Sequence, residues 1–448
     1  MFMDLRRWCT AATMLLAFGS ERAQASATLL LGEPYSYDGA FAGTGHVAVY
    51  LSRVCAESAV KLRRCAAGEQ GVVLSRYHGI GDYDWIAVPL IPYLYAVERQ
   101  DKIPLYADAK LEAFLRNRYR RQYLESIVPD REDGEPLEGQ WVQLVGAAYD
   151  RTIYAFQIET AEEKDNELIE LFNARPNAGQ YKLLSANCAD FVKQVINFYY
   201  PGALHRNVIS DLGVTTPKQI AKCLEHYAGH HSELQFSHFM IPQVPGSIKR
   251  SKPVKGVVES AFKSKKYMVP LLVWHPAIVA CFAAAYFTGS GGFDPGRHAL
   301  VLDPSLDLQP AMTAQQRREY LSRLDLLNRE LEADENAEAE NWSHLEGTAE
   351  PTVDAAGLPA WRLRVRETQV EIGLTRSNIV SDSESTSVAR KLLVARLHEE
   401  LRRNAVKTAE SIVGNDMSLL EQLCKVEERE RASRGGDREE METASGVR

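Results

Sequence analysis

The chain has 448 residues, of which 45% are hydrophobic and 25% are charged, and this composition is typical of globular protein. It is long enough for two or three domains. The formal net charge of −8 argues against a dedicated nucleic-acid-binding protein, because affinity for a duplex comes mostly from clustered Lys and Arg. Composition indicates no particular function, so any functional signal must come from local motifs.

The first 27 residues have the three parts of a secretory signal peptide. Basic residues precede an apolar run over residues 8–18, and residues 23–25 and 25–27 form small-residue cleavage sites. We therefore expect an exported protein at the periplasmic face of a membrane in the cell envelope, with a mature chain that begins near Ser26. The alternative is an uncleaved anchor, although the apolar run is short for a spanning helix.

Two of the seven cysteines, Cys55 and Cys65, lie close together in the sequence. Disulfides persist in exported proteins, so this pair is a candidate bridge. Two unpaired thiols remain the alternative, because spacing alone does not fix the direction of the side chains. The cysteines at positions 188, 223, 281 and 424 have no obvious partners.

The hydrophobic pattern predicts sheet first and then helices. Short apolar runs broken by Gly, Asp and Pro over residues 27–97 favour an antiparallel sheet. Helical spacing follows over residues 108–127, and residues 151–160 and 162–172 are typical of a strand and an amphipathic helix. Thr216 and Pro217 indicate the start of another helix.

Cys188 stands in the first turn of a further helix, which begins after Asn187 and ends at Pro201. A helix N-terminus lowers the pKa of a thiol through its free amides and its dipole, and the same amides can hold an oxyanion. Cys188 is therefore a candidate nucleophile. The alternative is a buried small side chain with no chemical role.

A nucleophilic thiol needs a base, and His46 has the most informative setting of the eleven histidines. It follows Gly45 and begins the strand-like run over residues 47–51. A strand holds a general base rigidly. The alternative is an ordinary polar residue at the surface.

Taken together, these two blocks resemble a known superfamily. Residues 45–51 (GHVAVYL) and 187–192 (NCADFV) are similar to the two catalytic blocks of the permuted NlpC-type papain-like families, which include the lecithin:retinol acyltransferase-like proteins. A closer resemblance is to the periplasmic domain of the Lnb-type lipoprotein N-acyltransferases, in which an Arg-containing strand, here residues 150–156, lies between the blocks. The resemblance covers roughly residues 30–227.

The resemblance implies a fold and a chemistry. The fold would be α+β, a permuted papain-like domain of antiparallel sheet and packed helices over residues 28–241. Cys188 would attack an ester or amide carbonyl, His46 would take and return the proton, and a thioester would pass its acyl group to an amine or to water. A third polar group would orient the imidazole. His78 is the candidate from the resemblance.

Other groups could orient the imidazole instead: Ser75, Asp82 and Asp84. Asn187 is a common helix-cap residue and is expected to fix the turn. His226 and His230 stand four residues apart beside His231, but we favour a solvated helix end over a zinc site there. The sequence gives no sign of an organic cofactor.

The middle of the chain suggests attachment to a membrane. Residues 242–266 form a linker with seven basic residues, and residues 267–288 contain no charge, which is long enough for a spanning helix. The alternative is a buried hairpin or core helix. The Lnb-type enzymes have several membrane helices, whereas at most one or two are visible here.

Residues 289–448 are polar and charge-rich, and no catalytic motif is evident in them. Residues 314–333 and 385–410 are typical of solvated helices, residues 361–372 of a hairpin, and residues 428–448 of a disordered tail. We interpret this part as an accessory region that could recruit protein partners.

Three functional hypotheses follow. The first is an extracytoplasmic cysteine acyltransferase or amide or ester hydrolase that acts on a lipid, lipoprotein or cell-wall substrate. The second is a peptidoglycan peptidase of the same fold. The third is a membrane-tethered scaffold whose papain-like domain only binds.

Overall fold

The computed structural model describes residues 25–35, 44–135, 139–208, 211, 213–289, 291–303, 307–334, 342–365, 367–379, 385–403 and 407–445. Nearly all of the predicted signal peptide lies outside the described residues. The chain divides into two compact units that alternate along the sequence. Unit 1 comprises residues 1–98, 115–243 and 249–308, and unit 2 comprises residues 99–114, 244–248 and 309–448.

Unit 1 is built on an eight-stranded sheet with the order β10-β9-β8-β7-β1-β2-β5-β6. Its strands are β1 (Ser26–Gly32), β2 (His46–Leu51), β5 (Val72–Ser75), β6 (Ile86–Pro89), β7 (Ile153–Glu159), β8 (Ser237–Ile241), β9 (Leu300–Leu302) and β10 (Leu308–Gln309). A separate hairpin contains β3 (Val54–Ser58) and β4 (Lys61–Arg64). β1 and β2 are buried along their whole length, so the core of unit 1 lies around them.

The sheet is antiparallel within residues 28–241, as predicted, and becomes mixed where β9, which lies outside that range, joins it. The pairs β1–β2, β1–β7, β2–β5, β5–β6 and β7–β8 are antiparallel, but β9 runs parallel to β8. A parallel neighbour needs a long crossover connection. The long stretch of chain between β8 and β9 supplies that crossover.

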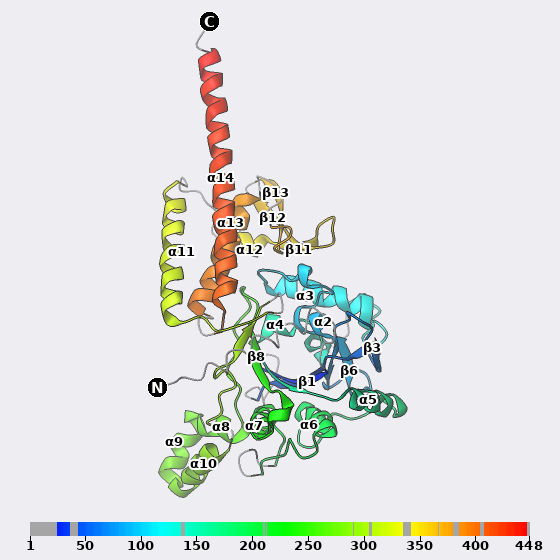
Figure 1. Ribbon diagram of the computed structural model, residues 1–448. Helices are drawn as coiled ribbons and strands as arrows, with labels where there is room; N and C mark the ends of the chain where they lie inside the picture. Colours follow the sequence, from blue (N-terminus) through cyan, green and yellow to red (C-terminus); the bar gives the residue numbers. More distant parts are fainter. Residues whose placement is uncertain are drawn as a thin grey trace. The chain divides into compact units, whose positions relative to one another are not determined.

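Helices lie on both sides of the sheet, as Figure 1 shows. α6 packs against β2 and β5, and α7 against β1 and β7, while α2 and α4 lie on the opposite side. The helices of this part of the chain are α2 (Leu90–Tyr95), α3 (Ala109–Tyr119), α4 (Ala147–Asp150), α5 (Glu162–Ala174), α6 (Cys188–Tyr199) and α7 (Pro217–Ala228). The α+β class predicted from the sequence is confirmed.

Local sequence signals explain most of these boundaries. The Thr216 side chain accepts a hydrogen bond from the Gln219 backbone N–H and caps α7, as predicted, and the helix ends at Gly229. The prediction of sheet over residues 27–97 is wrong for residues 90–95, which form α2. Pro92 stands in the first turn of that helix, where its missing N–H would have no intrahelical partner in any case.

The predicted membrane-spanning helix over residues 267–288 is wrong. The run breaks at His275, whose backbone has φ −145° and ψ 67°, into α9 (Lys265–Trp274) and α10 (Pro276–Thr288). Pro276 begins the second helix because its fixed φ suits a first helical position. α10 packs against both α9 and the preceding α8 (Val257–Phe262). Within the described ranges, no helix combines the length and apolar character that crossing a membrane requires.

Unit 2 contains its own sheet and helices. Its strands and helices are β11 (Glu350–Val353), β12 (Pro359–Val365), β13 (Thr368–Gly373), α11 (Ala314–Asp334), α12 (Trp342–Thr348), α13 (Thr386–His398) and α14 (Glu410–Ser445). β12 and β13 confirm the hairpin predicted around residues 361–372. Trp361 is fully buried, as are Leu392 and Leu420, so this region has a core. α14 continues to Ser445, into the tail that the sequence predicted to be disordered.

A buried ionic cluster lies inside unit 2. The Arg396 Nε donates to an Asp416 carboxylate oxygen at 2.6 Å, and the Arg396 guanidinium lies 2.9 Å from a Glu400 carboxylate oxygen. Arg376 donates to the second oxygen of Asp416 at 2.5 Å. Arg396 also donates to the backbone carbonyl of Leu105, which belongs to the same unit. Burial raises the pKa of Glu400 well above its usual range.

Candidate active site

His46 lies at the end of the sheet where β2 begins, and two glycines make room for it. The strand register places Gly32 of β1 directly opposite His46. A Cβ on Gly45 would lie 2.2 Å from the Gly32 carbonyl oxygen, and Gly45 has φ +66°. A Cβ on Gly32 would in turn lie 2.6 Å from the Arg151 side chain. The Gly-His motif therefore lets β2 start close to β1 and lets Arg151 cover that point.

Tyr77 is the neighbour of His46 that sequence patterns did not single out. β2 and β5 pair in a register that joins Val49 to Leu74, and continuing it by three residues brings Tyr77 opposite His46. The two rings stack with their centroids 4.1 Å apart and an interplanar angle of 11°. The Tyr77 hydroxyl donates to the Gln143 carbonyl oxygen at 3.0 Å, which fixes the ring. The imidazole is thus held by a cross-strand aromatic pair.

Arg151 lies next to the imidazole, just before β7 begins. Its side chain is buried at 3% exposure, its guanidinium lies 4.1 Å from the centre of the Tyr35 ring, and its Nη2 donates to Gln143 Oε1 at 3.2 Å. Burial, and then the charge of Arg151, hold the pKa of His46 well below its usual range. The imidazole is therefore neutral at neutral pH. Its Nε2 is buried and has no hydrogen-bond partner among the described residues.

Cys188 is the first residue of α6, as predicted, and Asn187 is the cap. The Asn187 side chain accepts a hydrogen bond from the Asp190 N–H at 3.0 Å and donates to the Thr215 carbonyl oxygen at 3.0 Å. Asp190 in turn accepts from the Thr215 hydroxyl at 2.6 Å. Cys188 is not part of a disulfide, and it is 6% exposed. A well-capped helix start beneath a thiol favours its thiolate form.

The structure brings His46 and Cys188 into one cluster of side chains through the tyrosines around them. Burial is the main cause that raises the pKa of Tyr77, and the nearby Cys188 contributes. Burial raises the pKa of Tyr93 to about 12, with Cys188 again among the smaller causes. The Tyr181 hydroxyl lies within hydrogen-bonding reach of the Cys188 thiol and backbone N–H. Because Nε2 of His46 has no partner among the described residues, that nitrogen does not hold the thiol in this structure.

A polar pocket adjoins the cluster. It has a volume of about 280 Å³ and is lined by residues of two segments, 76–84 and 179–181. Tyr77, which stacks on His46, and Tyr181, which contacts Cys188, are part of its wall. His46 and Cys188 themselves do not line the pocket, so a substrate in it would contact the two tyrosines.

The four candidates for the orienting group take different places. His78 is exposed, and its ring lies edge-on to Tyr181 with 5.9 Å between the centroids. Asp84 pairs with Arg76 at 2.5 Å, and Asp82 lines the pocket. Ser75 is fully buried at the end of β5, and its hydroxyl has no hydrogen-bond partner among the described residues. None of the four donates to or accepts from Nε2 of His46.

A contact between a cysteine and a histidine that the sequence did not suggest lies at α7. The Cys223 sulfur on α7 lies 3.7 Å from Nε2 and 3.8 Å from Nδ1 of His205. Burial raises the pKa of the Cys223 thiol, and neither residue lines the pocket. Cys223 is therefore a poorer nucleophile than a thiol at a helix start, and it offers an internal comparison for Cys188.

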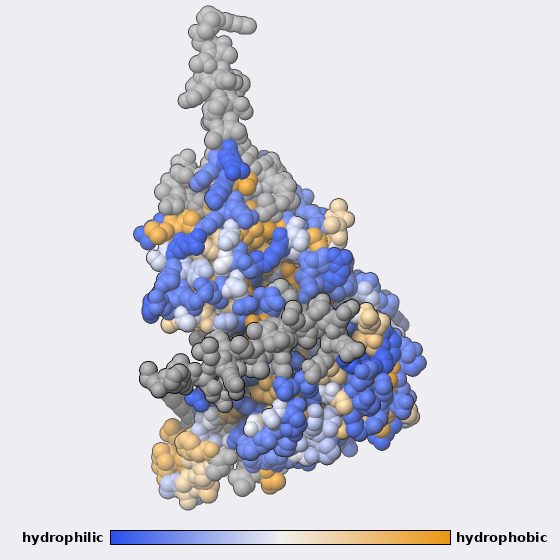
Figure 2. Space-filling model, viewed as in Figure 1, coloured by the Kyte–Doolittle hydropathy of each residue, from blue (hydrophilic) through white to orange (hydrophobic). Residues whose placement is uncertain are grey.

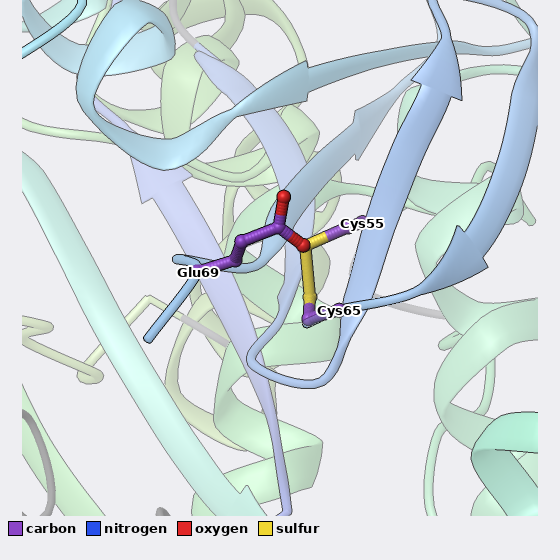
Figure 3. Close-up of side chains that lie close together, drawn as sticks. All are labelled: Cys55, Cys65 and Glu69. Atoms are coloured by element: carbon purple, nitrogen blue, oxygen red, sulfur yellow. A yellow bond between two sulfur atoms is a disulfide. The ribbon is translucent and has the colours of Figure 1, made fainter. Parts of the chain in front are cut away.

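The candidate bridge between Cys55 and Cys65 is present as a disulfide (Figure 3). It joins the two strands of the β3–β4 hairpin near their open end. The Glu69 carboxylate lies beside it, where Arg63 donates to both of its oxygens at 2.6 and 2.8 Å. These three residues are the only set of His, Cys, Asp or Glu in the described ranges with the spacing of a metal site. The bonded sulfurs are not available as thiolate ligands, so the group is structural.

The His226, His230 and His231 group forms a helix end. The rings of His226 and His230 lie 4.6 Å apart, and Nδ1 of His230 is 2.8 Å from the His226 carbonyl oxygen. His231 stacks on Tyr227 instead. In the described ranges, no further ligand atom completes a metal site with them.

Comparison with known proteins identifies no family. No protein-family model, curated protein or solved structure matches the chain at a significant level. The resemblance to the Lnb-type periplasmic domain therefore stays a prediction.

The protonation of His46 gives a test of this geometry. We expect its imidazole to titrate below the ordinary value of about 6.5, because it is buried and Arg151 repels a second positive charge. Arg151→Gln should raise the pKa, whereas Arg151→Lys should leave it low. Nuclear magnetic resonance titration of the His46 ring C–H signals measures this pKa in each variant. His78→Gln is the control, and it should leave the pKa of His46 unchanged.

The same shift affects stability, and its sign can be worked out. The folded pKa of His46 lies below the unfolded value, so the unfolded state binds the proton more readily. The free energy of unfolding should therefore fall as the pH drops from about 6.5 through the lowered pKa, by up to about 1.4 kcal/mol per pH unit. His46→Gln should flatten this slope. An unchanged slope in that variant would contradict the assignment of a buried neutral imidazole.

Proposed function

We propose that this protein is an extracytoplasmic cysteine-dependent acyltransferase or hydrolase, with Cys188 as nucleophile and His46 as general base. The observation that carries the proposal is a neutral, buried imidazole, whose Nε2 has no partner among the described residues, in the same cluster as a thiol at a capped helix start. The disulfide between Cys55 and Cys65 supports export, because such bonds persist outside the reducing cytosol.

The reaction would proceed in two steps. His46 Nε2 takes the thiol proton, and the Cys188 sulfur attacks the carbonyl carbon of an ester or amide. The tetrahedral intermediate collapses, the carbon–oxygen or carbon–nitrogen bond breaks, and the leaving alcohol or amine takes the proton from His46. An amine or a water molecule, deprotonated by His46, then attacks the thioester and releases the thiol.

The negative oxygen of the intermediate would need hydrogen-bond donors. The Cys188 backbone N–H faces the Tyr181 hydroxyl, which occupies the place that such an oxygen would take. Tyr181 would therefore move aside, or donate its own hydroxyl proton in a hydrogen bond, when substrate binds. Cys188 itself is only 6% exposed.

The substrate class remains a lipid, a lipoprotein or a cell-wall component. A peptidoglycan peptidase is the second candidate, and the polar pocket favours it. Arg76, His78, Asp82 and Asp84 all line the pocket, and such a lining suits a peptide better than an acyl chain. A non-catalytic binding module is the third candidate, and the burial of the Cys188 thiol, which is only 6% exposed, favours that.

Alkylation by iodoacetamide tests the proposal without a known substrate. We expect Cys188 to react at lower pH than Cys223, because the helix start favours the Cys188 thiolate while burial raises the pKa of Cys223. His46→Ala should slow the reaction of Cys188 near neutral pH and leave Cys223 unchanged. Mass spectrometry of the two peptides gives both rates from one sample. Equal rates for both thiols at every pH would count for the binding module.

A further inference from the structure

The hairpin formed by α9 and α10 presents apolar side chains to solvent. Eleven large hydrophobic side chains are exposed in the described ranges, and six of them lie on this hairpin. The six are Val269, Leu272, Val273, Trp274, Ile278 and Phe287. Figure 2 shows an apolar lobe at the lower left, at the place of α9 and α10 in Figure 1. Such a concentration on a soluble surface marks a place that something else covers.

The two helices are too short to span a bilayer, and the first is too exposed to belong to a core. They contain 10 and 13 residues, and the sequence from 267 to 288 has no charge. An apolar helix of this length is a core helix, or a segment that lies in the interface of a bilayer. Val273 is 74% exposed and Trp274 is 76% exposed, so α9 is not a core helix.

The charge around the hairpin is opposite in sign to that of the whole chain. Residues 249–297 contain eight Lys or Arg and two Asp or Glu, whereas the chain has a net charge of −8. Lys263 lies 5.5 Å from the Tyr286 ring on α10, and Lys265 is the first residue of α9. Lys263 and Lys265 therefore stand at the base of the hairpin. This charge complements anionic headgroups.

The dimensions fit a single leaflet. A helix of 10 residues is about 15 Å long, which is about half of the 30 Å hydrocarbon thickness of a bilayer. The chain turns back at His275, directly after Trp274, so the tip of the hairpin is apolar and aromatic while its base is basic. Tryptophan is a side chain that favours the boundary between headgroups and acyl chains.

We propose that the α9–α10 hairpin docks unit 1 onto a lipid surface with anionic headgroups, by inserting its apolar tip into one leaflet. The hairpin does not cross the bilayer, and both of its ends stay on the same side. The inference does not depend on the thiol chemistry of Cys188. If both hold, the enzyme works at a lipid surface, and its acyl donor or acceptor is a molecule embedded there.

Flotation with vesicles tests the docking, and the chain offers a matched control. Val273 on the hairpin and Val208 outside it are 74% and 73% exposed. We expect Val273→Glu to reduce the fraction of full-length chain that floats with equimolar phosphatidylglycerol and phosphatidylcholine vesicles by about tenfold. Val208→Glu should leave it unchanged. Residues 8–18 are also apolar, but both variants keep them. The test is therefore the difference in flotation between the two variants.

A second readout reports the position of the hairpin itself. Lipids with brominated acyl chains should quench tryptophan fluorescence of the bound protein, and Trp274→Phe should remove a large part of that quenching. Replacing the anionic lipid by phosphatidylcholine alone should weaken binding. Equal flotation of both glutamate variants would overturn the proposal. So would self-association in analytical ultracentrifugation that Val273→Glu abolishes in the absence of lipid, because the hairpin would then dock onto a second copy of the chain.

Discussion

Cys188→Ser is expected to reduce the turnover of activated acyl esters or thioesters by about a thousandfold or more. Serine at a helix start is a much weaker nucleophile than a thiol, and the neutral His46 imidazole is too weak a base to ionise it fully. His46→Gln should reduce this turnover by about a hundredfold to ten-thousandfold, because the proton of the thiol then has no acceptor. Release of a chromophoric leaving group measures the rate, and intact mass measures the acyl-enzyme.

The control for both variants is Cys223→Ser. Cys223 lies beside His205, so it shares the residue types of the candidate site, but burial raises the pKa of its thiol. We expect this variant to keep the full rate. An acyl group found on Cys223 rather than on Cys188 would move the active site to α7 and contradict the proposal.

Arg396→Met is expected to lower the free energy of unfolding of unit 2 by about 3 to 5 kcal/mol. Asp416 is completely buried and accepts hydrogen bonds from Arg396 and Arg376. Without Arg396, its carboxylate keeps one ion pair, with the half-exposed Arg376, and its hydrogen bond with Glu400. Denaturant unfolding followed by the fluorescence of the buried Trp361 gives the change.

The matched control is Arg323→Met, which removes an ion pair with Glu421 at the surface of the same unit. This variant should lower the free energy of unfolding by only about 0 to 1 kcal/mol, because water screens exposed ion pairs. The pH dependence of unit 2 gives a further check. The pKa of Glu400 is raised in the folded state, so its contribution to stability is lost as the pH rises through that pKa. Equal costs for the two arginine variants would contradict the role of the buried cluster.

The parts of the candidate site that the sequence could predict are those set by neighbouring residues. Asn187 and Cys188 begin a helix because the cap and the apolar spacing lie within one segment. Gly45 and His46 begin a strand for a similar reason. Tyr77 could not be found in this way, because its place opposite His46 depends on the register of β2 and β5, which no local pattern fixes.

The errors have physical causes of the same kind. The run over residues 267–288 has the composition of a spanning helix, but Pro276 divides it and the two halves pack on each other. The average composition of residues 267–288 does not reveal that break. The buried Arg396 also gave no signal, because its partners include Leu105, which is 291 residues away in the sequence.

The alternation of the two units along the chain has a consequence for the order in which they fold. Residues 99–114 belong to unit 2, yet most of that unit comes after residue 308. A chain made at about 5 to 20 residues per second exposes Leu105 for roughly 15 to 60 s before Arg396 emerges. The contact between Arg396 and Leu105 therefore forms late, so residues 99–114 cannot take their final place in unit 2 until the C-terminal part of the chain has been made.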